Sequence, residues 1–165
     1  MKTLIIYYSE REKTQIVSRT LSMHLKADII KIEDLKDRKG FANRLLSSIH
    51  AIRESKTKIY PEKVDLSDYD LIYIGTPTWS SNPTPAILTL IDNCDWMGKD
   101  VIAFTTMDKS GGKSTLNRME EKLRMRGARV IETFSIKTKD KSSEKLINDT
   151  ESMINILDLK MYSGV

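Results

Sequence analysis

The residues of this chain that are best suited to chemistry lie in three short polar segments, each directly after an apolar run. The first segment, residues 9–14, has the hydroxyl side chains Ser9 and Thr14 at its ends and the cations Arg11 and Lys13 between them. Hydroxyl groups and backbone N–H groups at the start of a helix can hold a phosphate group without a metal ion. The segment therefore predicts a phosphate-binding loop, with ordinary helix capping as the alternative role of Ser9 and Thr14.

The second polar segment follows the apolar run Leu71–Ile74 and surrounds Trp79. An aromatic side chain in a loop after a strand can form a flat wall for a planar ligand, whereas aromatic core residues usually lie within helices and strands. The alternative is that Trp79 is a lid that packs on Pro83 and Pro85. The candidate binding residues here are Thr76, Pro77, Thr78, Trp79, Ser80, Ser81 and Asn82.

The third segment begins at Thr106 and Met107 and contains the pair Gly111 and Gly112. Glycine lets a ligand approach the main chain closely, so this segment predicts an edge of peptide groups. A phosphate cradle, an aromatic wall and such an edge together suit a planar mononucleotide. The sequence has two histidines and no HExxH, GxSxG or paired-cysteine motif, so it predicts neither a metal site nor hydrolytic chemistry.

The elements that must position these segments are strands alternating with helices. Apolar runs without alternation are typical of strands buried on both faces of a parallel sheet. We expect an α/β fold with a doubly wound, five-stranded parallel sheet in the order 2-1-3-4-5, which brings the ends of the first, third and fourth strands together. The predicted strands are residues 2–8, 27–32, 71–74, 101–106 and 130–136; the predicted helices cover 14–25, 41–52, 85–91, 113–126 and a stretch from 142.

Composition and length limit the other possibilities. The 27 basic and 23 acidic residues are interleaved, which indicates a solvated surface and no nucleic-acid partner despite a net charge of +4. The length favours a single domain, residues 1–165, with the polar residues 56–68 as an internal linker. Cys94 is the only cysteine and is expected to be a small, partly buried apolar residue. The first apolar run is too short for a signal peptide or a membrane span, so we expect a cytoplasmic protein with no membrane partner.

The three segments resemble those of the flavodoxin family in order and spacing, and the resemblance covers most of the chain. The matching stretches read YYSxxxxT, GTPTWSSNPTP and FTTMDKSGGKS, and residues 39–53 resemble the longer connection of some short microbial members. The flavodoxin fold is itself a standard example of this strand order, with FMN at the point where the order reverses. The resemblance implies that Ser9 and Thr14 contact the FMN phosphate, that residues 76–82 line one side of the isoalloxazine ring, and that residues 106–112 border its pyrimidine end.

Two departures from the family pattern affect the expected affinity. The family's first loop usually reads SxTGxT, but here Arg11 replaces the threonine and Glu12 replaces the glycine. Glu10 and Glu12 would repel a phosphate, and Arg11 and Lys13 offset part of that repulsion. In the second loop, Ser80 and Ser81 replace the further aromatic residue and the glycine of many members. We therefore expect FMN binding that is weakened but not abolished.

The resemblance favours an FMN-dependent electron-transfer protein whose partner is a redox protein or a small-molecule electron acceptor. It would act as a monomer or a homodimer. Two alternatives remain open at this stage. One is an FMN-dependent NAD(P)H:quinone or flavin reductase, and the other is a binding module that keeps the fold without tight flavin binding.

Overall fold

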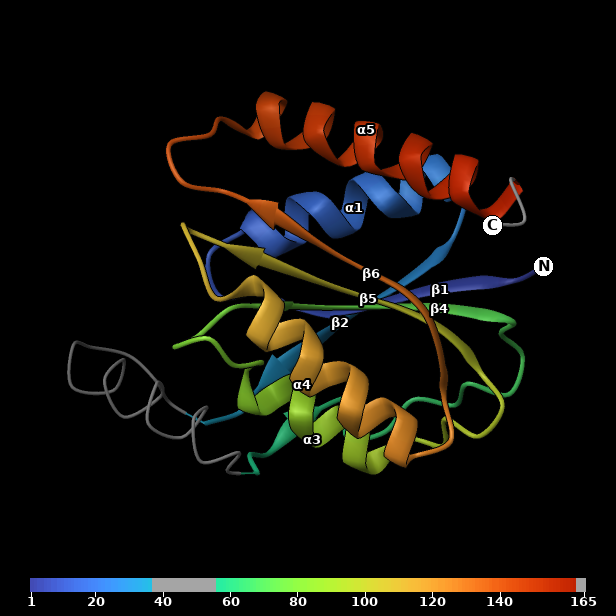
Figure 1. The fold of residues 1–165 in the computed structure, drawn as a ribbon. Helices are drawn as coiled ribbons and strands as arrows, with labels where there is room; N and C mark the ends of the chain where they lie inside the picture. The colour runs from blue at the N-terminus through green and yellow to red at the C-terminus, as the bar shows by residue number, and fades with distance from the viewer. Residues whose placement is uncertain (37–55, 163–165) are drawn as a thin grey trace.

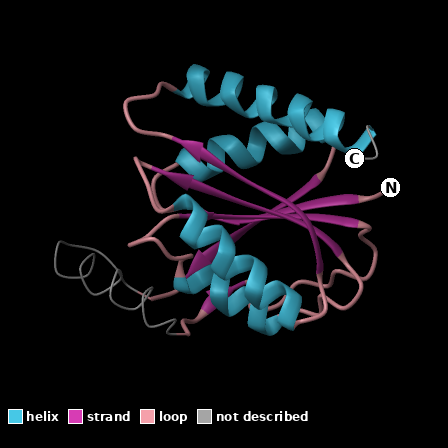
Figure 2. Cartoon of the chain, viewed as in Figure 1, coloured by secondary structure: helices cyan, strands magenta, loops and turns pink. Residues whose placement is uncertain are grey.

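The computed structural model describes residues 1–36 and 56–162, which form one twisted sheet between two layers of helices (Figure 1). The strands are β1 (Thr3–Tyr8), β2 (Asp28–Asp34), β3 (Ile59–Tyr60), β4 (Leu71–Pro77), β5 (Asp100–Met107) and β6 (Arg129–Lys137). The described helices are α1 (Lys13–Leu25), α3 (Pro85–Asn93), α4 (Gly112–Met125) and α5 (Ser143–Tyr162). Helices α1 and α5 cover one face of the sheet, and α3 and α4 cover the other (Figure 2). The helix predicted over residues 41–52 lies outside the described residues.

The predicted order of the parallel strands is confirmed. The sheet runs β3-β2-β1-β4-β5-β6, and every neighbouring pair from β2 to β6 is parallel. The predicted number of strands was wrong, because the described chain has six: the two-residue β3 pairs antiparallel with the outer edge of β2. A two-residue strand shows no periodicity in the sequence, so nothing there distinguished it from a loop.

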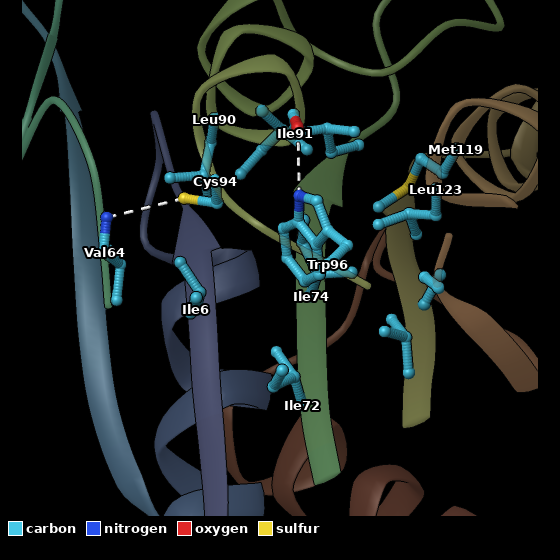
Figure 3. Packing of buried hydrophobic residues seen from close by; sticks show 14 of the residues in the cluster. Ile6, Val64, Ile72, Ile74, Leu90, Ile91, Cys94, Trp96, Met119 and Leu123 are labelled. Carbon is cyan, nitrogen blue, oxygen red and sulfur yellow. Dashed lines mark hydrogen bonds between the residues drawn. The ribbon is translucent and has the colours of Figure 1, made fainter. Parts of the chain in front are cut away.

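The segment 56–68 is more than a linker. Ile59, Val64 and Leu66 are at most 7% exposed and belong to the hydrophobic core on the α3 and α4 side of the sheet. The backbone N–H of Val64 donates to Sγ of Cys94 at 3.4 Å (Figure 3). Cys94 is only 5% exposed and packs in this core, and its burial raises the pKa of the thiol, which argues against a reactive thiolate.

The central strands lack alternation because both of their faces are covered. Along β1, Leu4 and Ile6 face the core beneath α3 and α4, while Ile5 faces the core beneath α1 and α5, and all three are fully buried. In the first of these cores, Trp96 packs near Met119 and Leu123, and its Nε1 donates to the carbonyl of Ile91 at 2.9 Å (Figure 3). Because both of its faces are packed, the sheet provides a firm base for the loops at its carboxyl edge.

The helix ends agree with the sequence at some positions and differ at others. Pro85 begins α3 as predicted. Gly127 ends α4 with φ 84° while the N–H of Ala128 donates to the carbonyl of Leu123 at 3.0 Å, the Schellman arrangement. The predicted helix capping by Thr14 is wrong: α1 is preceded by Glu12, with φ 59° and no side-chain cap, and Thr14 is buried.

Two helix positions and the sheet edge complete the comparison with the sequence. Helical spacing in the sequence predicts His24 on α1 and Ile147 on α5 to lie on the apolar faces of their helices, but both are exposed. Strand β6 is an edge strand as predicted, with a register shift opposite Val101 and Ile102. In the described part of the chain, no helix has the length and apolar character needed to cross a membrane.

Candidate functional site

A cleft of about 840 Å³ opens at the carboxyl edge of the sheet, where loops after β1, β4, β5 and β6 meet. Figure 1 shows the start of α1 and the loops after β5 and β6 on the same side of the molecule. The structure brings most of the predicted site residues together here: the cleft is lined by Ser9, Arg11, Lys13, Thr14, Pro77, Thr78, Trp79, Ser80, Ser81, Thr106 and Met107.

The first loop turns sharply before α1 and leaves backbone donors available. Glu12 has a left-handed backbone (φ 59°), and the N–H of Lys13 donates to the carbonyl of Arg11 at 2.6 Å. Ser9 Oγ accepts the N–H of Gln15 at 3.2 Å. Among the described residues, the backbone N–H groups of Arg11, Glu12 and Thr14 have no recorded acceptor. Amides in this arrangement at a helix start suit an anion.

The side chains of Thr14 and Thr106 connect the first loop to the end of β5. Their hydroxyl oxygens lie 2.7 Å apart and share a hydrogen bond, and both side chains are buried. The Thr14 hydroxyl is therefore engaged within the protein, which the sequence could not show. A ligand that reaches it must join or replace this hydrogen bond.

Trp79 is held on the second wall by a tight turn and by a neighbouring ring. The backbones of Trp79 and Asn82 exchange two hydrogen bonds of 2.9 Å, and Ser80 and Ser81 between them have φ of 48° and 62°. Positive φ at both central positions defines a type I′ turn. The ring of Tyr8 meets that of Trp79 edge-on, with centroids 5.9 Å apart. The indole is half-buried, so part of it packs on the core while it lines the cleft.

Four predicted residues lie behind the lining and shape it. Thr76 is fully buried and its Oγ1 accepts the N–H of Thr84 at 3.1 Å, while the Asn82 amide donates to the carbonyl of Ser80 at 2.8 Å. A Cβ on Gly111 would lie 2.8 Å from Ser81 Oγ, and one on Gly112 would lie 2.7 Å from Met107 Sδ. Gly111 also has φ 91°, so this position needs glycine, whereas a side chain at position 112 would require the Met107 side chain to shift.

The sequence analysis missed one wall of the cleft, which is formed by residues 138–141 between β6 and α5. Thr138 is buried, Lys139 and Asp140 are exposed, and Lys13 Nζ donates to the carbonyl of Lys141 at 3.1 Å. One signal could have identified this wall: the predicted order places the last strand beside the fourth, so the loops after both strands lie at the same edge. The polar sequence of residues 138–141, TKDK, however, is typical of an ordinary connection.

The charges around the cleft are mixed, with an excess of cations. Five cationic side chains and three carboxylates line it: Arg11, Lys13, Lys109, Lys139 and Lys141, with Glu10, Asp108 and Asp140. Glu12 does not line the cleft. Within residues 1–36 and 56–162, no group of three or more His, Cys, Asp or Glu could hold a metal ion. Free amides, hydroxyls and an aromatic wall fit a ligand with a phosphate at one end and a planar ring at the other.

Comparison with known sequences identifies related proteins. Residues 2–152 match a family model described as flavodoxin. A curated flavodoxin from Nostoc sp. is 28% identical over 96 residues, which are 53% of this chain and 56% of that protein. The chain thus matches just over half the length of this relative.

Solved structures with the same fold extend over more of the chain. A candidate flavoprotein from Bacteroides uniformis has a TM-score of 0.76 at 23% identity, covering 91% of this chain and 97% of its own. A flavoprotein from Lactobacillus acidophilus, solved in complex with FMN, has a TM-score of 0.69 at 23% identity, covering 81% of this chain and 92% of its own. At this identity the likeness concerns the fold, which agrees with the observed strand order.

Proposed function

Because the chain belongs to the flavodoxin family, we propose that it binds FMN in the cleft and passes electrons between the cofactor and a redox partner. One observation carries the proposal: Arg11 and Thr14, whose backbone N–H groups have no recorded acceptor, line the same cleft as Trp79. When bound, FMN would supply the electron-transfer chemistry, and the protein would supply binding and orientation.

The first loop is the proposed site of the FMN phosphate. The N–H groups of Arg11 and Thr14 and the hydroxyl of Ser9 are the donors, with Lys13 beside them. The glutamate at position 12 lowers affinity less than the sequence suggested, since its backbone has the left-handed conformation that glycine favours and its side chain does not line the cleft. The carboxylate of Glu10 does line it, so some repulsion of the phosphate remains in the proposal.

The proposed position of the isoalloxazine ring is between Trp79 and the loop that begins at Met107. An indole can stack on a flat aromatic ring, and this contact requires no charge on either partner. The Thr78 and Thr105 hydroxyls share a hydrogen bond of 2.8 Å, which holds the second loop against the end of β5. These residues orient the ring and keep water from its face.

Two relatives add support. The Lactobacillus acidophilus flavoprotein was solved with FMN, and the Nostoc protein is a flavodoxin. The proposed partners of this chain are a redox protein or a small-molecule electron acceptor, and the proposed location is the cytoplasm.

A second candidate is an FMN-dependent reductase that uses NADH or NADPH. The observation that favours it is the size of the cleft together with its cationic lining, because about 840 Å³ lies in the upper part of the usual range for small-molecule sites. Oxidation of NADH or NADPH by the FMN-loaded protein with a quinone as acceptor distinguishes an enzyme from a carrier. Turnover of the nucleotide in the absence of any other reductase would favour the enzyme.

The experiment that tests the carrier begins with the purified protein mixed with excess FMN and separated from free flavin. We expect a flavin absorbance spectrum, bleaching by dithionite, and its return when the reduced protein, freed of dithionite, is mixed with ferricytochrome c, whose own spectrum shows reduction. A protein that stays colourless and leaves cytochrome c oxidised is the third candidate, a binding module without flavin.

A further inference from the structure

The loop between β6 and α5, residues 138–141, lines the cleft beside the proposed phosphate site. The family resemblance implies ligand contacts from the loops after three strands, and the loop after β6 is a fourth loop that lines the cleft. Its nearness to the first loop is recorded directly, because Lys13, in the first turn of α1, donates from Nζ to the carbonyl of Lys141 at 3.1 Å. The loop and the phosphate-binding amides therefore lie within one lysine side chain of each other.

The 138–141 loop is held in one conformation by the protein. The N–H of Thr138 donates to the carbonyl of Met107 at 2.8 Å, and the N–H of Lys141 donates to the carbonyl of Thr138 at 3.3 Å across a turn. Asp140 in that turn has φ 58°. The Lys141 ammonium contacts Asp149 on α5 at 2.6 Å. A side chain presented from such a turn loses little further backbone freedom when it binds a ligand.

The two ammonium groups at the base of this loop are already engaged, whereas Lys139 is not. Lys13 contacts the Lys141 carbonyl and Lys141 contacts Asp149. Lys139 lies at the exposed tip of the turn, lines the cleft, and has no recorded hydrogen bond or ion pair with any residue in 1–36 or 56–162. It is a cation that remains available to a ligand.

The proposed phosphate site needs additional positive charge. A phosphate monoester carries about −1.5 to −2 charges at neutral pH. Of the charged residues in the first loop, Glu10, Arg11 and Lys13 line the cleft, and Glu12 does not. Their net charge is one positive charge, and the Lys13 ammonium already donates to the Lys141 carbonyl. The first loop therefore supplies amide donors but less charge than a phosphate monoester carries, and another element at the cleft can supply further attraction.

We infer that the 138–141 loop is a second phosphate-recognition element, in which Lys139 contacts the phosphate end of the bound cofactor from the side opposite the first loop. This inference rests on the proposed FMN function. It explains how a site with a glutamate-rich first loop still attracts a dianion. The chemical class that it recognises is a phosphate monoester, and the inference predicts discrimination between FMN and riboflavin, which lacks that group.

The test compares the dissociation constants of FMN and riboflavin, measured by flavin fluorescence quenching at low ionic strength. For Lys139→Ala, we expect FMN binding to weaken about 2- to 5-fold, as for a charge pair at an exposed position, and riboflavin binding to stay unchanged. The matched control is Lys137→Ala, because Lys137 is also exposed, at the end of β6, but does not line the cleft. Lys139→Arg keeps the charge and is expected to retain most of the FMN affinity.

Salt provides a second readout. The FMN affinity of the wild-type protein should fall with increasing salt more steeply than that of Lys139→Ala, since the variant has lost one screened interaction with the phosphate. Equal salt dependence in the two proteins would contradict a direct contact. Circular dichroism of both variants is expected to match the wild type, because each removed side chain is exposed.

The outcomes separate this inference from the proposed function. If the wild-type protein binds neither flavin, the proposed function fails and the inference with it. If the wild type binds FMN but Lys139→Ala binds it equally well, or loses FMN and riboflavin equally, only the inference is overturned. It is also overturned if FMN binding is unchanged while the FMN-loaded variant loses affinity for NADPH, because the lysine would then contact a second ligand.

Discussion

Single residues of the site adopt backbone conformations that glycine favours, although they are not glycine. Glu12 in the first loop and Ser80 and Ser81 in the second all have φ between 48° and 62°. A left-handed residue with a side chain costs roughly 1–2 kcal/mol. Such strain concentrates where a loop must hold a ligand, and the surrounding hydrogen bonds maintain it. Both loops of the proposed FMN site therefore carry this cost.

The turn at Ser80 and Ser81 gives a stability prediction. Ser81→Gly should raise the free energy of unfolding by about 0.5–1 kcal/mol, since the removed strain exceeds the entropy that glycine adds to the unfolded chain. Urea denaturation measures this difference. Ser152→Gly is the control, because Ser152 is exposed within α5, where the same substitution should instead destabilise the protein. A destabilised Ser81→Gly protein would contradict the strain argument.

Trp79 gives a binding prediction. Trp79→Ala should weaken FMN binding by about 1–3 kcal/mol, the range for a flat ring stacked on an aromatic side chain, or roughly 5- to 150-fold. Trp79→Phe retains an aromatic wall and should recover most of the affinity. Titration of flavin fluorescence with each protein compares them. Unchanged affinity in Trp79→Ala would mean that the indole is a structural lid.

At the scale of elements, β4 and β5 depend on a small residue opposite a large one, because Gly75 pairs with Phe104 and faces its ring. A Cβ on Gly75 would overlap the Phe104 ring, which also stacks on Phe134 with centroids 5.3 Å apart. Gly75→Ala should therefore destabilise the fold by about 1–3 kcal/mol or more. The substitution Phe104→Leu should lower the free energy of unfolding by less in the Gly75→Ala protein than in the wild type. A double-mutant cycle with urea denaturation measures this difference. Simple additivity would show that the two residues are not in conflict.

Asp149 on α5 forms ion pairs with Lys145 on the same helix and with Lys141 in the loop that lines the cleft. Hydrogen bonds from Lys141 and Lys145 hold the pKa of the Asp149 carboxyl below its ordinary value of 3.8. A lowered folded-state pKa means that the carboxylate stabilises the protein above the unfolded-state pKa, and that this contribution disappears as the pH falls through the lower folded value.

Asp149→Asn tests this linkage. At pH 7 the variant should unfold more easily than the wild type, by less than about 1 kcal/mol because solvent screens the pairs. The difference should begin to shrink as the pH falls toward 3.8, where the carboxyl takes up a proton in the unfolded chain, and should disappear below the lower pKa of Asp149 in the folded protein. Thermal or urea unfolding across this range measures it. A difference that persists undiminished at the lowest pH would exclude the charge interaction as its cause.

The elements also show what the sequence could predict. Uninterrupted apolar runs predicted β1, β4 and β5, because burial on both faces leaves a direct trace in composition. The strand order followed from the alternation of strands and helices along the chain. Strand β3 and the 138–141 loop left no such trace, since their roles depend on which element lies beside them. The sequence placed Thr14 and Thr76 near the site, yet a hydroxyl can face a ligand or another protein group equally well. Only the structure shows that these two bond to Thr106 and Thr84.

At the scale of the whole molecule, the cleft lies where the strand order reverses. Strand β1 lies between β2 and β4, so the connections from β1 and β4 leave toward opposite faces of the sheet and open a gap between them. The loops after β5 and β6 extend that gap and add cations to its rim. The proposed FMN site is thus a consequence of topology, and the charges on its loops adjust the affinity.

The most direct test of this account is a titration of the purified protein with FMN, followed by the quenching of flavin fluorescence. The account predicts saturable quenching with one flavin per chain and a melting temperature that rises with FMN concentration, since a ligand that binds only the folded state stabilises it. Flavin fluorescence and melting temperature that both stay unchanged up to millimolar FMN would contradict it.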